Sequence, residues 1–354
     1  MNKFKFPPRI DFDHILRTRV SDYLKEHNIK ETGNKIMQAK GLSIFIGMLA
    51  IYYGLVFQTE SILMGFVMTF LLVQAQILIA FNVMHDGGHG SFSSKKWLNE
   101  LASLSLEFLG ASSSLWKQKH NNLHHTYTNI DGKDDDLDIN GMIRLSPRQE
   151  KKPWHNYQHF YAPFLYGFLS LYMLFYSDFK KMITKKIGDT PLRPIGKTQL
   201  SLFVISKVFY IIYALVIPMF FHNPLVVIGY FLFSHFIFGL TLSIVFHLAH
   251  TVRETTFPTP DVNGTLPYSW VEHQLHTTSN FAQKNWFVTF YCGGLNYQVE
   301  HHLFHKISHV HYPRISKIVK ETCEEFGKPY NVNPSFWFAL KSHFSFLKLM
   351  GQST

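Results

Sequence analysis

Four apolar blocks, each near the length that a bilayer requires of a helix, constrain this chain more than any other feature. They cover residues 41–57, 61–84, 201–221 and 225–249, and about 20 apolar residues are needed to span the hydrocarbon core. Because lipid offers no hydrogen bonds, backbone groups there must be satisfied within the segment, as in an α-helix. The sequence therefore predicts an all-α integral membrane protein with four transmembrane helices.

The connections between the blocks predict the topology. Residues 58–60 join the first two blocks and residues 222–224 join the last two, so we expect two hairpins. Neither connection contains Lys or Arg, whereas the segments outside the hairpins contain nearly all of the 34 basic residues. By the positive-inside tendency, both tips face outward, and both termini lie in the cytosol. Lys207, in the third block, is expected to extend its ammonium group to the basic side.

A fifth apolar stretch, residues 160–176, has spanning length but contains Pro163 and eight Phe or Tyr residues. This composition is typical of the membrane interface. A crossing here would also put the histidines before it and after it on opposite sides of the membrane. We therefore expect this stretch to lie in the interface.

The remaining sequence predicts a large water-exposed part. Hydrophobic residues make up 46% of the chain, yet its mean hydropathy is only −0.01. We expect residues 85–200 and 251–354 to form a helical cytosolic cap, with a helix over residues 98–115. The domain organisation is then a cytosolic segment 1–40 without a signal peptide, a membrane enzyme domain 41–330 and a cytosolic tail 331–354.

Charge and cysteine content exclude other classes. The net charge is +10, but no nucleic-acid motif accompanies it and the basic residues are dispersed among apolar blocks, so a membrane surface explains the charge better than a nucleic acid. Cys292 and Cys323 are the only cysteines. Two cysteines in a chain of this size do not form a disulfide framework, and we expect reduced thiols.

Histidines fall in three clusters that this topology brings to one membrane face. Two of them four apart follow the second block, a run of three with the same spacing comes next, and an adjacent pair follows the fourth block. Residues four apart share a helical face, whereas adjacent ones diverge and can address two different metal ions. The cluster members are His85, His89, His120, His124, His125, His301 and His302.

The number of imidazoles indicates a two-metal site. A single zinc ion needs about four ligands, and imidazole-rich sites suit Fe, Cu or Zn. The sequence contains neither HExxH nor any Glu-x-x-His, which argues against zinc peptidases and against carboxylate-bridged di-iron bundles. A histidine-dominated di-metal centre remains.

The motifs HDGGH (85–89), HNNLHH (120–125) and QVEHH (298–302) resemble the three histidine boxes of membrane fatty acyl desaturases. Gln298, the LAH sequence at 248–250, TTSNF at 277–281, CGGLN at 292–296 and HVHYP at 309–313 resemble the front-end branch, similar to cyanobacterial Δ6 acyl-lipid enzymes. The resemblance implies two Fe ions, O2 as co-substrate, an acyl tunnel and insertion of a cis double bond into an already unsaturated chain. It also implies that His250 is a metal ligand. We expect Gln298 to ligate a metal or to contact a ligand.

The resemblance also implies partners. The first 40 residues lack the HPGG motif of a fused cytochrome b5 domain, so we expect electrons from a separate donor of ferredoxin or cytochrome b5 type. A basic cytosolic face would steer such an acidic carrier. The substrate is expected to be a membrane lipid or an acyl-CoA, and the location a bacterial inner membrane with the metal site on the cytosolic side. The acyl carrier, the position of the new double bond and the oligomeric state stay open.

Two alternative functions are compatible with the residues. A hydroxylase could use the same scaffold, since hydrogen abstraction is common to both reactions. A metal-binding or transport protein could use the histidines as an ion path, although the clusters lie at one membrane face. Among the other groups, carboxylates in the run 131–138, Asp86 and Glu300 are expected to orient ligand imidazoles. We expect structural or orienting roles for the remaining histidines at 222, 235, 247, 305, 309 and 311.

Overall fold

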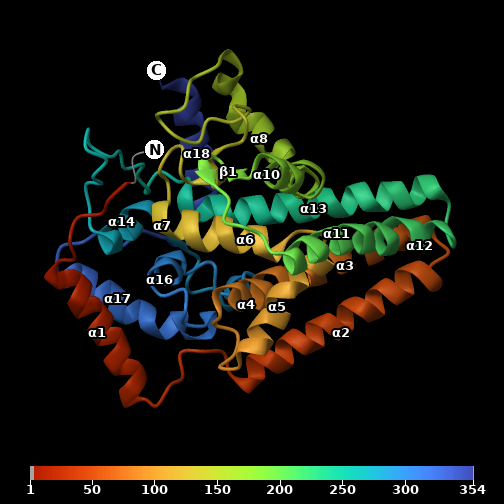
Figure 1. Cartoon of the computed structure of the whole chain (residues 1–354), viewed down its shortest axis with the longest axis horizontal. Helices are drawn as coiled ribbons and strands as arrows, with labels where there is room; N and C mark the ends of the chain where they lie inside the picture. The colour runs from red at the N-terminus through yellow and green to blue at the C-terminus, as the bar shows by residue number, and fades with distance from the viewer. Residues whose placement is uncertain (1–3, 354) are drawn as a thin grey trace.

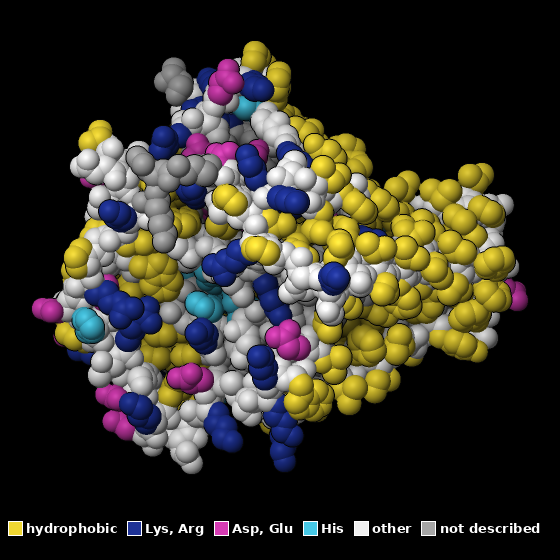
Figure 2. Space-filling model, viewed as in Figure 1, with side chains coloured by type: hydrophobic (Ala, Val, Ile, Leu, Met, Phe, Trp, Pro, Cys, Tyr) yellow, Lys and Arg dark blue, Asp and Glu magenta, His cyan; other side chains and the backbone are white. Residues whose placement is uncertain are grey.

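A computed structural model, describing residues 4–353, contains four helices that are long and apolar enough to cross a membrane. They cover Lys35–Phe57, Ile62–His89, Lys197–Met219 and Pro224–His250. These helices extend together to one end of the molecule, where hydrophobic side chains cover the surface (Figures 1 and 2). The prediction of four spanning helices is confirmed, but the first helix begins six residues earlier than predicted, and the second continues through His89.

The second and third spanning helices are not regular along their whole length. The first is α2 (Lys35–Phe57), and the second comprises α3 (Ile62–Ile79), a π-helical turn η1 (Ala80–Met84) and α4 (His85–His89). The third comprises α11 (Lys197–Ile211), the π-helical turn η6 (Ile212–Val216) and α12 (Ile217–Met219), and the fourth is α13 (Pro224–His250). In space, α2 packs against α3, and α3 packs against α13.

Side chains at the short connections explain where the helices begin. Ser61 accepts a hydrogen bond from the backbone N–H of Met64, and Asn223 accepts one from Leu225. Such side chains satisfy N–H groups that lack a partner in the first helical turn. Pro224 occupies the first turn of α13, where its missing N–H has no cost.

Short helices, and two pairs of two-residue strands, make up the rest of the described chain. Figure 1 places most of them at the end opposite to the hairpin tips. The antiparallel pair is β1 (Lys186–Ile187) with β2 (Thr190–Pro191), and the parallel pair is β3 (Asn280–Phe281) with β4 (Val332–Asn333). The helical elements are α1 (Asp11–Glu26), α5 (Lys96–Phe108), α6 (Ser113–Lys119), η2 (His120–His124), α7 (His125–Tyr127), η3 (Asp135–Leu137), η4 (Pro153–Tyr157), α8 (Gln158–Tyr166), α9 (Leu169–Tyr172), η5 (Met173–Ser177), α10 (Asp178–Thr184), α14 (Trp270–Thr277), α15 (Trp286–Tyr291), α16 (Gln298–Leu303), η7 (His309–His311), α17 (Tyr312–Glu325) and α18 (Phe336–Gln352).

The two ends of the chain pack on opposite sides of the histidine-bearing elements. Near the N-terminus, α1 packs against α17 and buries Phe12, Leu16 and Val20 in the largest apolar cluster of the described residues. At the other end, α18 packs against α8 and α13. The segment predicted as a C-terminal tail therefore consists largely of a packed helix.

The apolar stretch 160–176 is divided into short helices. Pro163 lies within α8, and a break at Gly167 separates α8 from α9. A nine-residue helix is only about 14 Å long, too short to span a bilayer. Within residues 4–353, this stretch is not among the four helices that could cross a membrane.

Two local predictions were wrong. The helix expected over residues 98–115 ends at Phe108, because Gly110 adopts a left-handed φ of 84° and the Glu107 carboxylate then accepts hydrogen bonds from Ser113, at the start of α6. Lys207 does not extend toward the surface. It is buried, and its Nζ lies 2.6 Å from Asp178 Oδ2 and 2.7 Å from the Gly110 carbonyl oxygen. The Asp178 carboxylate stabilises the buried Lys207 ammonium, so the side chain does not need to reach water.

The buried pair gives a stability prediction. Lys207→Met leaves the Asp178 carboxylate without its cation, and breaking such a pair costs about 3–5 kcal/mol. We expect a large drop in the thermal unfolding midpoint in detergent. The double variant Lys207→Met/Asp178→Leu removes both charges and should recover most of that loss. Lys180→Met, on an exposed lysine of α10, serves as the control, and a double variant no more stable than Lys207→Met would contradict the assignment.

Candidate metal centre

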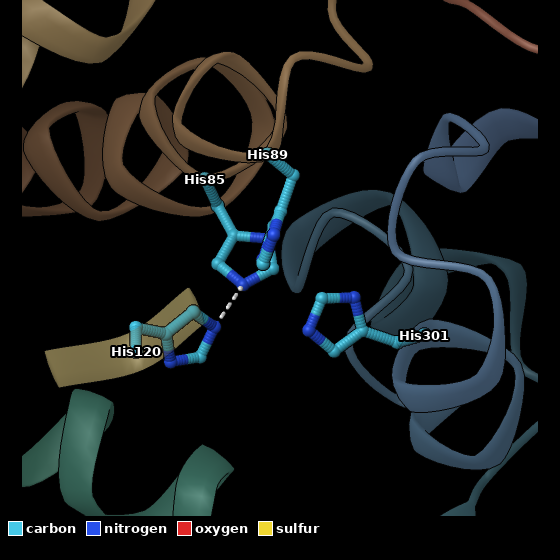
Figure 3. Close-up of side chains that lie close together, drawn as sticks. All are labelled: His85, His89, His120 and His301. Carbon is cyan, nitrogen blue, oxygen red and sulfur yellow. Dashed lines mark hydrogen bonds between the residues drawn. The ribbon is translucent and has the colours of Figure 1, made fainter. Parts of the chain in front are cut away.

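Four chain segments bring the clustered histidines together. His85 and His89 lie on α4, the polar end of the second spanning helix, and His120 lies on η2. His301 and His302 lie on α16. Figure 3 shows His85, His89, His120 and His301 pointing toward one common space from three different segments. His250 joins them from the last residue of α13.

The ring nitrogens form sets with the spacing of metal ligands. One nitrogen from each of His85, His89, His120 and His301 lies within 4.8 Å of the others. A second set with the same limit contains His124, His250 and His302, and a third contains His125, His301 and His302. The sets share histidines, and the side chains of all of them are buried. The arrangement can hold two metal ions side by side.

Local helix geometry separates the members of the second cluster. His120 to His124 form a π-helical turn, whose backbone hydrogen bonds run between residues five apart instead of four. The rings of His120 and His124 are stacked, 5.2 Å apart and 18° from parallel, whereas those of His124 and His125 lie at 84° to each other. His120 belongs to the first set, and His124 to the second. Adjacent His124 and His125 also point to different sets, as the sequence predicted.

The glycines of HDGGH allow other helices to approach the site closely. A Cβ atom at Gly88 would lie 2.3 Å from the Trp116 ring, and one at Gly87 would lie 2.6 Å from Ala102. Trp116 itself stacks on His120 with ring centroids 4.4 Å apart. The two glycines thus let α5 and α6 press the second histidine cluster against the first.

Hydrogen bonds fix the tautomers of three histidines. His124 donates from Nδ1 to Asp134, at 3.1 Å, His250 to the Thr277 carbonyl oxygen, at 3.2 Å, and His302 to Gln274 Oε1, at 2.8 Å. None of these oxygens can donate a proton, so Nδ1 carries the hydrogen in each ring. The lone pair of Nε2 is then free for a metal, the usual arrangement of histidine ligands.

The site contains buried polar atoms that the protein itself leaves without partners. They include Nε2 of His301 and of His302, both ring nitrogens of His89, Nδ1 of His125 and Oε1 of Gln298. An unsatisfied buried polar group costs roughly 1–3 kcal/mol. A set of such atoms concentrated around one space fits bound metal ions, which would accept their lone pairs.

The electrostatic environment keeps most of the imidazoles neutral. Burial and repulsion from neighbouring histidines hold the pKa of His120, His125, His301 and His302 well below the usual value. His124 differs, because the carboxylates of Asp134 and Asp136 outweigh its burial and raise its pKa. Neutral imidazole is the form that binds metals.

The acidic run after the second cluster contacts both His124 and two lysines. Asp134 hydrogen-bonds to His124, as the sequence predicted for a carboxylate of this run, and Asp136 Oδ2 lies 3.3 Å from the same His124 Nδ1. Asp136 also forms an ion pair with Lys119, and Asp135 pairs with Lys119 and with Lys181 of α10. Lys119 and His124 together hold the pKa of Asp136 well below its usual range.

Asp86 and Glu300 do not contact the clustered histidines as predicted. Asp86 accepts hydrogen bonds from Ser308, at 2.8 Å, and from His309 Nδ1, at 3.0 Å. Glu300 accepts hydrogen bonds from Asn280 and Tyr330, and its burial raises its pKa to about 7. Both residues follow or precede a clustered histidine by one position, so their side chains leave the helix in another direction.

The histidines outside the clusters have mostly structural contacts. His222 lies within 3.1 Å of the carbonyl oxygens of Leu55 and Val56, across the two hairpin connections. His235 contacts Ser170 and Tyr210, and His247 contacts Thr251 and stacks on His343. His305 is an exception, because its ring lies 5.2 Å from that of His89 and 5.0 Å from that of His125.

A cavity of about 640 Å³ leads to the histidines. It runs between α6, α8–α10 and α13, and its lining includes His85, His120, His124, His250 and His301 as well as Gln298. Apolar side chains form one part of its wall, among them Leu115, Trp116, Leu165, Leu169, Met173 and Phe246, and charged side chains from 133–138 and 180–189 form another. An elongated molecule with one apolar and one polar end would match this wall.

Gln298 lies at this cavity and is 2% exposed. It is the first residue of α16, one turn before His301 and His302. With His85, His89, His120, His124, His125, His250, His301 and His302, it completes the nine residues predicted for the site. The structure brings all nine to one region, and their role as ligands stays a prediction.

Sequence reasoning missed several residues that hold the histidines in place. Gln274 and Thr277 lie on α14, and Tyr312 begins α17, with its hydroxyl 3.2 Å from His301 Nδ1. Trp116 was not linked to the site either. Thr277 and Tyr312 fall within the two short motifs noted for their resemblance to front-end enzymes, but no spacing rule connects either with a particular histidine.

Comparison with known proteins agrees with a histidine-rich membrane enzyme. The family model described as fatty acid desaturase matches residues 60–334. An sn-1 linoleoyl-lipid 6-desaturase of Synechocystis sp. is 34% identical over 99% of both chains, and one of Arthrospira platensis is 35% identical over 99% of this chain and 95% of its own. An acyl-lipid (8-3)-desaturase of Physcomitrium patens is 34% identical over 96% of this chain and 72% of its own.

A helical fold with four candidate membrane spans and buried histidine sets compatible with a metal site, together with these relatives, indicates a membrane oxidoreductase. The chain belongs to the fatty acid desaturase family. The resemblance noted from the three motifs is confirmed, and the interpretation as a metal transport protein is wrong.

The contact between Asp134 and His124 predicts an effect on metal binding. Asp134→Asn removes the charge that orients His124 and raises its basicity, and loss of such a partner typically lowers metal affinity 10- to 100-fold. We expect less metal per chain after dialysis against a weak chelator, measured by elemental analysis. Asp138→Asn, an exposed carboxylate four residues later, is the control, and equal metal content in both variants would argue against the orienting role.

Proposed function

We propose that this desaturase uses two iron ions and O2 to introduce a cis double bond into a lipid-linked acyl chain, with Δ6-type regiochemistry. The observation that carries the proposal is the pair of histidine sets around one space, {His85, His89, His120, His301} and {His124, His250, His302}, at the end of a cavity with apolar walls.

The donor atoms support iron. All but one of the nine residues offer imidazole nitrogen, a donor that suits Fe, Cu and Zn, and of these only Fe and Cu have the redox chemistry that desaturation requires. Two bound iron ions with O2 would supply the oxidising power for removing hydrogen from an unactivated methylene. Overall, two hydrogens leave neighbouring acyl carbons, two electrons and two protons enter from outside, and one O2 becomes two waters.

The protein contributes by positioning the acyl chain and by burying it away from water. Burial of an acyl chain against the apolar part of the cavity stabilises binding by about 0.8 kcal/mol per methylene. The same contacts hold one carbon pair beside the histidine sets, and positioning is the main way in which a protein of this kind selects a reaction. His124, His250 and His302 keep fixed tautomers in this region through Asp134, Thr277 and Gln274.

Relatives support the regiochemistry and the carrier. The proteins of Synechocystis sp. and Arthrospira platensis are sn-1 linoleoyl-lipid 6-desaturases, and their similarity extends over nearly the full length of both chains. We infer a substrate of the same kind here, an unsaturated acyl group on a membrane lipid. The charged part of the cavity wall is compatible with a polar headgroup near the histidines.

Feeding experiments test the reaction. In a host without polyunsaturated lipids, expression of the chain together with linoleate is expected to give an 18-carbon product with a third double bond at carbon 6, located by mass spectrometry. Ala at any of His85, His89, His120, His124, His125, His301 or His302 should abolish this product while leaving the protein in the membrane. His14→Ala, at an exposed position on α1, is the control. A hydroxylated product, or activity in two or more of the seven variants, would refute the proposal.

Gln298 is proposed to contribute its amide oxygen to the metal site. Its Oε1 is buried without a hydrogen-bond partner, and an amide oxygen can ligate iron weakly or accept a hydrogen bond. We expect Gln298→His to keep iron and part of the activity, and Gln298→Leu to lose activity because leucine offers neither. Iron content and product yield are measured in matched membranes. Full activity of Gln298→Leu would put the residue outside the metal site.

The orientation in the membrane is part of the proposal. We infer a bacterial inner membrane with two helical hairpins whose tips face outward, and a helical cap that holds the metal site in the cytosol. The desaturase domain covers residues 41–330, between the cytosolic segments 1–40 and 331–354. A separate carrier of ferredoxin or cytochrome b5 type supplies the electrons. The absence of Lys and Arg from both tips supports this orientation.

Cysteine labelling tests the orientation. Cys292 and Cys323 are both buried, so an impermeant maleimide should react weakly with the unmodified chain. We expect Glu60→Cys, at a hairpin tip, to be labelled in intact spheroplasts, and Lys151→Cys to be labelled only after the membrane is opened. Labelling of Lys151→Cys in intact spheroplasts would contradict the proposed orientation.

A further inference from the structure

A second cavity reaches the histidine cluster from a different side. It has a volume of about 370 Å³ and lies between α1, α14 and the segment that follows α16. Its wall contains Trp270 and His305. His89 and His125 do not line the first cavity. The rings of these two histidines lie against the ring of His305.

The distances from this cavity to the histidine sets are short. The His305 ring lies 5.2 Å from the His89 ring and 5.0 Å from the His125 ring, centroid to centroid. The Trp270 indole N–H donates to the carbonyl oxygen of His125, at 3.2 Å. A redox group held at this cavity would therefore be separated from two of the predicted ligands by single side chains.

The charges at this cavity favour a negatively charged partner. Arg17 and Lys306 line it, with the Arg17 guanidinium 5.4 Å from the centre of the Trp270 ring, and Glu31 is the one carboxylate in its lining. Figure 2 shows histidine side chains at the surface of the polar end of the molecule, with Lys and Arg side chains on several sides of them. Phe304, which is partly exposed, adds an apolar side chain to this lining.

We propose that the surface around this cavity, defined by Arg17, Trp270, His305 and Lys306, is where an acidic one-electron carrier protein docks and delivers electrons to the metal centre. The inference rests on the proposed function, because desaturation consumes two electrons from outside for each O2 reduced. The carrier docks twice per turnover and loses one electron each time. Separate cavities let the acyl chain stay bound at the first while the carrier binds at the second.

The test is a steady-state titration with the carrier. Iron-loaded protein in nanodiscs is supplied with lipid substrate, NADPH, ferredoxin reductase and an acidic [2Fe–2S] ferredoxin at increasing concentration. The variant Arg17→Gln/Lys306→Glu is compared with Lys341→Glu/Lys348→Gln, which changes two exposed lysines of α18 by the same total charge. Iron content and unfolding midpoint are recorded for each protein.

We expect kcat/KM for ferredoxin to fall about tenfold in the first variant, since steering by complementary charge changes association by this order or more. Turnover at saturating ferredoxin should change little, and the dependence of KM on ionic strength should weaken. Turnover driven by dithionite with a small viologen mediator should equal that of the wild type, which separates a docking defect from a damaged metal centre.

Three results would overturn the docking surface. The first is an unchanged kcat/KM for ferredoxin in Arg17→Gln/Lys306→Glu, and the second is an equal loss in the α18 control. Loss of mediator-driven turnover in the cavity variant together with ferredoxin-driven turnover would also count against docking, because it indicates a change at the metals. Failure of the wild type to form product with the mediator would speak against the proposed function instead.

Discussion

The crowding of neutral imidazoles in a buried space is the constraint on which the rest of this structure depends. Eight histidines meet there, and burial together with mutual repulsion disfavours the protonated forms of His120, His125, His301 and His302. Ring nitrogens without partners cost free energy in the metal-free protein. Contacts from outside the cluster, through Asp134, Gln274, Thr277 and Tyr312, hold the rings of His124, His250, His301 and His302 in place.

The candidate spanning helices also position three of these histidines. His85 and His89 continue the second span beyond its apolar part, and His250 is the last residue of the fourth. α3 and α13 pack against each other along the bilayer segment, which fixes the separation of these three histidines. Packing of the candidate spanning helices thereby sets the position of the histidines at their polar ends.

The two cavities divide the surroundings of the site by chemistry. The larger one has apolar walls and borders both main histidine sets, whereas the smaller one has two cations and an indole next to His305. The ion pairs of Lys119 and Lys181 with Asp135 and Asp136 connect α10, at the larger cavity, with the loop that orients His124. A change in the wall of the larger cavity can therefore alter the surroundings of His124.

The sequence by itself determined the four candidate spanning helices, the seven clustered histidines and the family, because apolar length and the spacing of chemical groups are local properties of the chain. Only the tertiary structure decided which nitrogens share a set, because the π-helical turn at 120–124 changes the directions expected for a regular helix. It also decided that Asp134, rather than Asp86 or Glu300, orients a clustered histidine, and that Lys207 pairs with Asp178. These contacts join residues whose distance in space depends on how separate helices pack, and no local pattern contains that information.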